Sequence, residues 1–229
     1  MLNDSFYDKK IVKKPWGCEH VCFRDKKKIA LTFLNINYKK KTSLHCHPKK
    51  KTGFILLEGK AKIQLGLWKS TSKIYKAPSK LMIRTGLFHS IQSLSKSGVK
   101  AIEFETPVLK HDLVRYQDNY GRRSKPYEGK KFIKSLSLAD VIFKKPSLKK
   151  KQIFKFGKLI LSLEVHTNFK KILKNKISTI FGILSGNVVD KRGRKILSAG
   201  DIIKLGTLKK LSKYFKINKQ LTLIILKLF

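Results

Sequence analysis

Short stretches of β-branched and aromatic residues, separated by turn residues, run through the first half of the chain. These stretches cover residues 29–36, 53–57, 61–67, 81–84 and 99–105. Turn-forming residues, such as Gly59, Gly98 and Pro107, stand between them. Many short strands joined by tight turns are typical of a β-sandwich or a β-barrel. The sequence contains no long amphipathic helical pattern, and residues 136–143 predict one short helix at most.

The second half of the chain repeats this pattern in a weaker form. Residues 180–186 resemble residues 53–59, and both segments end in glycine. Each half also closes on an apolar segment with the composition of a strand. A stretch rich in Lys, Ser, Gly and Pro separates the halves. The sequence therefore predicts an all-β protein with one domain over 1–128, a linker over 129–150 and a second β domain over 151–229.

The net charge is +39, from 53 basic and 14 acidic residues. Such a charge favours an anionic partner such as nucleic acid. However, only 7 of the basic residues are Arg, the residue best suited to bidentate binding of phosphates and to recognition of base edges. We therefore do not expect nucleic acid to be the main partner. The charge therefore keeps a basic nucleic-acid-binding protein as an alternative and does not by itself define the function.

Features that would place the protein in or across a membrane are missing from the sequence. No apolar run reaches the roughly 20 residues of a membrane-spanning helix. The first residues do not have the pattern of a secretion signal. The three cysteines are an odd number, which favours reduced thiols. We expect a cytoplasmic protein without a membrane span.

Two histidines, His45 and His47, stand two residues apart, and His89 follows a glycine much later in the chain. On a strand, residues i and i+2 point to the same face. Both imidazoles would therefore aim in one direction, and a third histidine on a neighbouring strand would join them. Three neutral imidazoles converging inside a β-barrel form a site for a divalent transition metal.

The second half does not carry these histidines. When Gly59 is aligned with Gly186, His45 and His47 fall on Ile172 and Lys174. His166, the second half's only histidine, stands elsewhere in the pattern. We expect the second domain to be structural.

Four segments of the first half form an ordered set of motifs. The set consists of an entry motif, KPWGCE at 14–19, a first histidine motif from Leu44 to Gly59, a second histidine motif at 86–89, and a last strand at 103–105 with the exit motif from Asp112 to Arg122. In this order and spacing, the set resembles the cupin superfamily, and within it the C-terminal domain of type II phosphomannose isomerases. The resemblance covers roughly residues 11–128. It implies a cupin jelly-roll barrel, and with the internal repeat a bicupin whose second barrel is degenerate.

The resemblance also implies a ligand set for the metal. The family holds its metal with two His and one Glu of the first histidine motif and with one His of the second histidine motif. In this sequence His45, His47 and His89 match these histidines. Thr52 stands where the family has Glu, and Lys39 stands where it has Gly. Three histidines and water can still hold Zn, Fe or Mn. The alternative is a metal-free polar or phosphate-binding pocket of neutral imidazoles.

Isomerisation of a sugar phosphate needs a base and a group that stabilises the enediolate. Glu103 and Glu105 share one strand face, so either is a candidate catalytic base if that face is interior. At the rim they would instead bind a histidine or an arginine. Candidates for binding the phosphate and the sugar are Lys51, Arg84, Arg115, Tyr120 and Arg122, of which Arg115 and Tyr120 belong to the exit motif.

Three functions remain open at this point. The first is an enzyme of sugar-phosphate or nucleotide-sugar metabolism, an isomerase or epimerase similar to mannose-6-phosphate isomerase and serving surface polysaccharide biosynthesis. The second is a sugar-binding or regulatory cupin without catalysis. The third is the basic nucleic-acid-binding protein. The resemblance further implies a homodimer formed at the barrel edge, unless the second half covers that edge.

Overall fold

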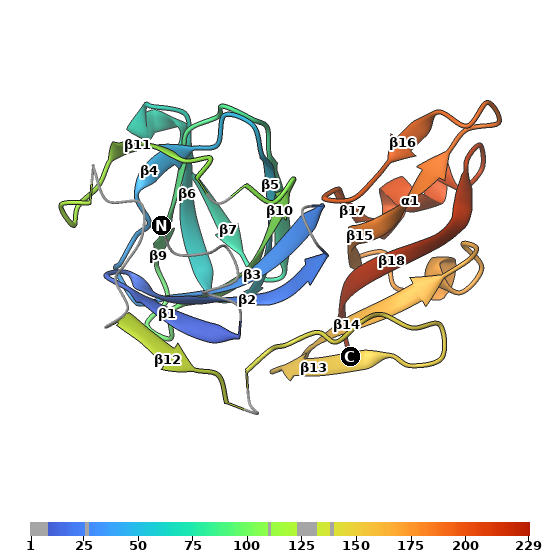
Figure 1. The fold of residues 1–229 in the computed structure, drawn as a ribbon, viewed down its shortest axis with the longest axis horizontal. Helices are drawn as coiled ribbons and strands as arrows, with labels where there is room; N and C mark the ends of the chain where they lie inside the picture. The colour runs from blue at the N-terminus through green and yellow to red at the C-terminus, as the bar shows by residue number, and fades with distance from the viewer. Residues whose placement is uncertain (1–8, 26–27, 110, 123–131, 138–139) are drawn as a thin grey trace. The chain divides into compact units, whose positions relative to one another are not determined.

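The computed structural model describes residues 9–25, 28–109, 111–122, 132–137 and 140–229. The chain divides into two compact units, one formed by Met1–Ser79 with Ile83–Ile142 and the other by Lys80–Met82 with Phe143–Phe229. Strands dominate both units (Figure 1). In the described parts of the chain, no helix has the length and apolar character needed to cross a membrane.

The strands of the first unit belong to two antiparallel sheets. The larger sheet has the strand order β12-β1-β2-β3-β10-β5-β8, and the smaller has the order β11-β4-β9-β6-β7. The strands of the larger sheet are β1 (Lys10–Lys14), β2 (Gly17–Asp25), β3 (Ile29–Ile36), β5 (Lys51–Glu58), β8 (Ser79–Ile83), β10 (Val99–Thr106) and β12 (Ile133–Ser135). Those of the smaller sheet are β4 (Leu44–Cys46), β6 (Lys60–Leu65), β7 (Lys73–Lys76), β9 (His89–Ser93) and β11 (Val114–Gln117), with the 3-10 helix η2 (Lys69–Thr71) before β7.

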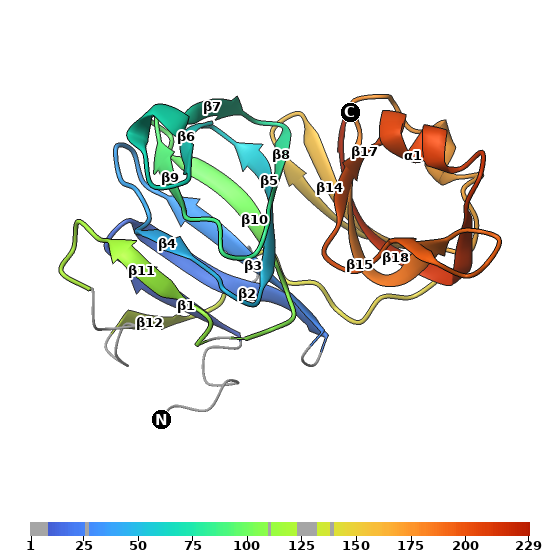
Figure 2. The same cartoon turned by 90° about the horizontal axis from the view of Figure 1, so that it is seen from above.

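The two sheets curve toward each other and enclose the interior of a jelly-roll barrel (Figure 2). The predicted all-β class and barrel are confirmed, because each of the five predicted stretches overlaps one of β3, β5, β6, β8 and β10. These strands form where β-branched and aromatic residues concentrate, since such side chains pack well on a pleated sheet. The short helix predicted over 136–143 is wrong for the described residues 136–137 and 140–143, which contain no helix.

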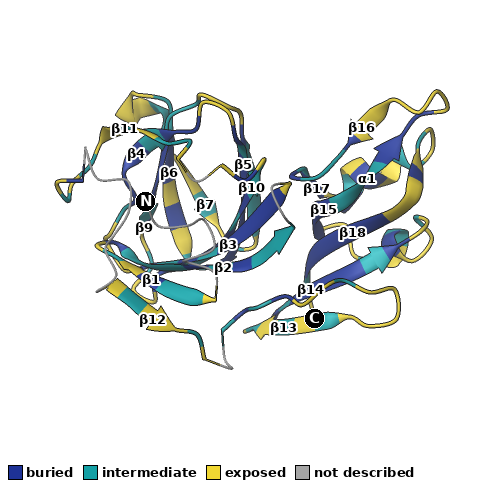
Figure 3. Ribbon diagram, in the orientation of Figure 1, coloured by how far each residue is buried: buried dark blue, intermediate teal, exposed yellow. Residues whose placement is uncertain are grey.

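Burial distinguishes the central strands from the edges. β3, β5 and β10 are largely buried, whereas the edge strands β7 and β12 are largely exposed (Figure 3). On β10, Ile102 and Phe104 are completely buried, while Glu103 and Glu105 alternate with them and face the barrel interior. β10 is therefore covered on both faces.

The second unit is built on one six-stranded sheet with the order β13-β14-β18-β15-β16, and β17 also pairs with β15. Its strands are β13 (Gln152–Phe156), β14 (Leu159–His166), β15 (Ile180–Val189), β16 (Lys195–Leu197), β17 (Ile202–Lys204) and β18 (Lys216–Leu228). Two short helices accompany the sheet, the 3-10 helix η4 (Ile172–Lys174) and α1 (Leu205–Leu211).

The two units share a strand order. The run β2-β3-β10-β5-β8 of the larger sheet corresponds to the run β13-β14-β18-β15-β17 of the six-stranded sheet. Gly59 and Gly186 also have matching backbones, with φ of 86° and 82°. A Cβ on Gly59 would lie 2.2 Å from the Gly98 carbonyl oxygen, and one on Gly186 would lie 2.0 Å from that of Gln220. The internal repeat thus corresponds to a repeated sheet.

The repeat is incomplete at the position of the histidines. Ile172 and Lys174, which align with His45 and His47, form the helix η4 instead of a strand. Ile172 is completely buried in an apolar cluster with Phe181, Ile183 and Leu223. An apolar core therefore occupies the second unit where the first unit has a polar cavity.

Candidate metal and ligand site

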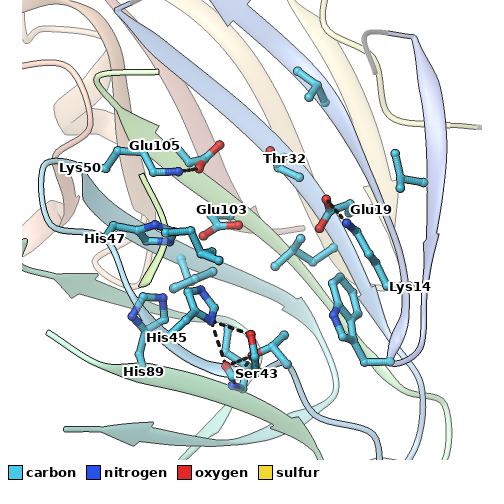
Figure 4. A pocket seen from close by; sticks show the side chains of 18 of the residues that line it. Lys14, Glu19, Thr32, Ser43, His45, His47, Lys50, His89, Glu103 and Glu105 are labelled. Carbon is cyan, nitrogen blue, oxygen red and sulfur yellow. Dashed lines mark hydrogen bonds and ion pairs between the residues drawn. The ribbon is translucent and has the colours of Figure 1, made fainter. Parts of the chain in front are cut away.

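The first and second histidine motifs meet on neighbouring strands. His45 lies on β4 directly opposite His89 at the start of β9. The backbone N–H of Gly86 donates to the carbonyl oxygen of His47 at 2.8 Å, which ties the two motifs together just outside the strands. The three imidazoles point into one cavity of about 170 Å³, lined by residues of both sheets (Figure 4).

One ring nitrogen of each histidine is fixed by a backbone carbonyl. The Nδ1 atoms of His45, His47 and His89 lie 2.9, 2.5 and 3.0 Å from the carbonyl oxygens of Ser43, Asp112 and Leu87. A carbonyl oxygen only accepts hydrogen bonds, so each Nδ1 carries the proton and donates it. Each Nε2 then carries a lone pair, which is the arrangement of metal-binding histidines.

The Nε2 atoms of His47 and His89 are buried, and neither has a hydrogen-bond partner among the described residues. A buried nitrogen without a partner is costly, and a metal ion would satisfy it. One ligand atom from each of the three histidines lies within 4.8 Å of the others. This cluster therefore fits a divalent transition metal.

Burial favours the neutral form of all three imidazoles. It lowers the pKa of His89 to about 4 and that of His45 well below its usual value, and the neighbouring histidines lower the pKa of His45 further. Burial and the Lys50 ammonium lower the pKa of His47. The three rings are therefore neutral at physiological pH, as metal binding requires.

Glu103 and Glu105 project from β10 into the same cavity. Burial, with a further contribution from Glu105, raises the pKa of Glu103 well above its usual value. Burial opposes ionisation of Glu105 too, but the ion pair with Lys50 outweighs it and holds the pKa of Glu105 below its usual value. The two carboxyl groups of β10 thus differ, since the surroundings favour the neutral form of Glu103 and the ionised form of Glu105.

The two departures from the cupin motif have clear structural counterparts. Thr52 is buried on β5 and faces Glu105 across the strand pair. Lys39 has a φ of 63°, in the left-handed region that favours glycine. The backbone therefore keeps the shape of a glycine position although the side chain has changed.

The remaining candidate residues separate into two groups. Arg115 and Arg122 line the cavity, and Arg122 forms an ion pair with Asp118 at 2.7 Å. The hydroxyl of Tyr120 accepts a hydrogen bond from the Lys41 N–H at 3.4 Å and does not line the cavity. Lys51 and Arg84 do not line it either; Lys51 is adjacent to the inward-facing Thr52 and Arg84 is exposed.

Lys50 and Ser43 both line the cavity but were not among the predicted site residues. Lys50 precedes β5, so strand alternation does not assign it to a face. Ser43 likewise precedes β4, and its Oγ lies 3.2 Å from Nδ1 of His45. The clearest sequence signal for both was their proximity to the first histidine motif.

Comparison with known proteins gives matches at the level of solved structures. The chain matches no family model and no curated protein. An uncharacterized conserved protein with a double-stranded β-helix domain from Klebsiella pneumoniae is 11% identical, with 51% of this chain and 86% of that chain covered and a TM-score of 0.39. The capsular polysaccharide assembling protein CapF from Staphylococcus aureus is 14% identical, with 47% and 34% covered and a TM-score of 0.41.

KdgF from Halomonas sp. is 9% identical, with 42% of this chain and 84% of that chain covered and a TM-score of 0.37. The chain spans about a third of the length of CapF. Sequence identities and TM-scores this low do not allow an activity or a ligand to be assigned from these proteins. The description of the first unit as a jelly-roll barrel rests on its own strand order.

Proposed function

We propose that the first unit binds a divalent transition metal, Zn, Fe or Mn, and isomerises or epimerises a sugar phosphate or nucleotide sugar for surface polysaccharide biosynthesis, in the manner of a mannose-6-phosphate isomerase. The observation that carries the metal site is the set of three neutral imidazoles with their Nδ1 atoms bound to carbonyls and their Nε2 lone pairs directed into one cavity. The proposal that the substrate is a sugar rests on the resemblance of the motifs to those of phosphomannose isomerases.

The cavity offers the groups that such a reaction needs. His45, His47 and His89 would hold the ion, which when bound would polarise a carbonyl oxygen as a Lewis acid. Glu103 projects its carboxyl group into the cavity beside the imidazoles, where it is the candidate base for proton transfer at carbon. Arg115 and Arg122 place positive charge on the wall, where it would favour a phosphate.

A sugar-binding protein without turnover is the second candidate. Thr52 stands where the resembling family has its carboxylate ligand, so the metal would be held by neutral groups alone in that motif. Weaker metal retention would favour ligand binding over catalysis. This candidate predicts that a sugar phosphate binds in the cavity and leaves it unchanged.

The first test is metal content, measured by mass spectrometry on full-length protein purified without an affinity tag, beside a His45→Ala/His47→Ala variant. Near-stoichiometric metal in the parent and its loss in the variant are expected. Equal metal content in both proteins, or none in either, contradicts the three-histidine site.

The second test is proton exchange in D₂O with mannose 6-phosphate, followed by NMR. Deuterium incorporation beside the carbonyl by the parent, abolished in Glu103→Gln, is expected of an isomerase. Binding of the sugar phosphate without exchange supports the non-catalytic candidate and contradicts the enzymatic one.

A further inference from the structure

An ion pair between a buried lysine and a half-buried glutamate lies beside the three histidines and is not explained by the proposed function. Lys50 is only 4% exposed, and its ammonium is paired with Glu105 (Figure 4). Both residues line the cavity that contains the imidazoles. A buried lysine is rare unless it is paired, and the position of this pair inside the candidate metal site requires a physical account.

The register of the strands shows where the pair stands relative to the missing ligand. Glu105 on β10 lies directly opposite Thr52 on β5, and both side chains belong to the same face of the sheet. Thr52 is the position at which the sequence resemblance expects a carboxylate. This chain therefore retains a carboxylate at the same level of the barrel, but on the neighbouring strand.

The charge of Lys50 acts on the imidazoles. The ammonium lies in the same cavity as the imidazoles of His47 and His89, so it adds a positive charge beside the nitrogens that would hold an ion (Figure 4). A divalent ion at the Nε2 atoms would be repelled by the same ammonium, and burial leaves this repulsion poorly screened by water or salt. The carboxylate of Glu105 would attract the ion but is engaged by Lys50.

We propose that the Lys50–Glu105 ion pair and a bound divalent metal are antagonistic: Lys50 is an internal cation that weakens metal binding, and Glu105 is the carboxylate that favours it. This inference rests on the proposed metal site at His45, His47 and His89. Among the described residues, the three-histidine cluster includes no carboxylate. The Glu105 carboxylate therefore attracts the metal ion only to the extent that its ion pair with Lys50 is broken.

The competing explanation is that the Lys50–Glu105 ion pair has a purely structural role. Lys50 and Glu105 neutralise each other, so the pair could serve only to close the barrel end. Loss of either partner would then lower the stability of the fold and leave the affinity for metal unchanged. Metal affinity, rather than stability or activity, separates the two explanations.

The experiment measures the dissociation constants of Zn²⁺, by competition with a chromophoric chelator, and the visible spectrum of bound Co²⁺ in full-length protein. The variants are Lys50→Met, Glu105→Gln and the double variant. Lys51→Met is the matched control, because Lys51 is adjacent in sequence but does not line the cavity. Circular dichroism verifies that each variant is folded.

We expect Lys50→Met to bind Zn²⁺ about tenfold more tightly or better, and Glu105→Gln to bind it about tenfold more weakly. A change in the Co²⁺ spectrum of Lys50→Met is expected from an altered set of oxygen ligands. Lys51→Met should bind like the parent. If Lys50→Met does not fold, the comparison of Glu105→Gln with the double variant isolates Lys50, and the double variant should bind more tightly.

The inference is overturned if Lys50→Met binds Zn²⁺ within twofold of the parent, or if the double variant binds it within twofold of Glu105→Gln. A purely structural role of the ion pair is then the remaining explanation. That result still permits the proposed metal site. Failure of the site itself has a different signature, since the parent would then bind Zn²⁺ no better than His45→Ala/His47→Ala.

Discussion

Arg115 and Ser43 are joined by a hydrogen bond of 3.2 Å from the guanidinium Nε to the hydroxyl oxygen. The same hydroxyl lies 3.2 Å from Nδ1 of His45, and Arg115 is paired with His45 in the register of β11 and β4. Arg115 also donates from Nη1 to the carbonyl oxygen of Arg122 at 2.5 Å. The residue that the exit motif suggested for substrate binding therefore also positions a histidine of the proposed metal site.

Replacing Arg115 should weaken metal binding without abolishing it. Arg115→Ala removes the donor that holds Ser43, which leaves His45 less well oriented, and loss of such outer support typically lowers metal affinity about 10- to 100-fold. The measurement is the Zn²⁺ dissociation constant. Arg84→Ala is the control, because Arg84 is exposed and outside the cavity. Equal effects of the two substitutions would show that only general charge is involved.

Lys39→Gly should stabilise the first unit. Lys39 has a φ of 63°, a conformation that costs an L-residue with a side chain about 1 kcal/mol and costs glycine almost nothing. We expect the free energy of unfolding, measured with urea, to rise by about 0.5–1 kcal/mol. Lys40→Gly is the matched control and should lower it, since Lys40 has no positive φ to relieve. A decrease in both variants would rule out strain at Lys39.

Gly59→Ala and Gly186→Ala should each destabilise their own unit. Their added Cβ atoms would lie 2.2 and 2.0 Å from backbone oxygens, so the strands must separate. We expect a loss of at least about 2 kcal/mol for each, measured by denaturant unfolding.

Two other glycines are controls for the backbone conformation alone. Gly86 and Gly157 also have positive φ, but a Cβ on either would meet nothing within 4 Å. Gly86→Ala and Gly157→Ala should therefore cost only about 1 kcal/mol. Similar losses at all four positions would mean that the close contacts at Gly59 and Gly186 relax easily.

Glu164 should make the second unit sensitive to acid. Its carboxylate accepts a hydrogen bond from Ser162 and lies close to His166 and Lys151, and although burial opposes ionisation, these partners lower the pKa of Glu164 to about 2. A carboxyl whose pKa is lower in the folded state stabilises the fold above its unfolded pKa. This stabilisation should be complete above about pH 4.5 and disappear as the pH falls toward 2.

The test compares Glu164→Gln with the parent by urea unfolding at several pH values. At pH 6 the variant should be less stable by about 1–3 kcal/mol, and the difference should shrink as the pH approaches 2. Glu58→Gln is the control, because Glu58 forms a more exposed ion pair with Lys100 and should change stability by less than about 1 kcal/mol. A difference that does not vary with pH would exclude Glu164 as the origin.

Local sequence pattern located most of the central strands. The stretch 29–36 coincides with β3, and 99–105 lies within β10, because β-branched and aromatic residues favour a pleated strand regardless of its partners. The spacing of His45 and His47 also placed both side chains together, since the period of a strand is a local property. The helix expected over 136–143 does not form in the described residues 136–137 and 140–143, because a short weak pattern does not outweigh tertiary context.

The face occupied by Glu103 and Glu105 was beyond local reasoning. Alternation identifies the interior face only where the other face is exposed, and here Ile102 and Phe104 are buried as well. The sequence alone determined the strands, the repeat and the three histidines, because these depend on period and spacing. Only the tertiary structure decided that Lys50 pairs with Glu105 opposite Thr52, because contacts between strands far apart in sequence depend on register and burial.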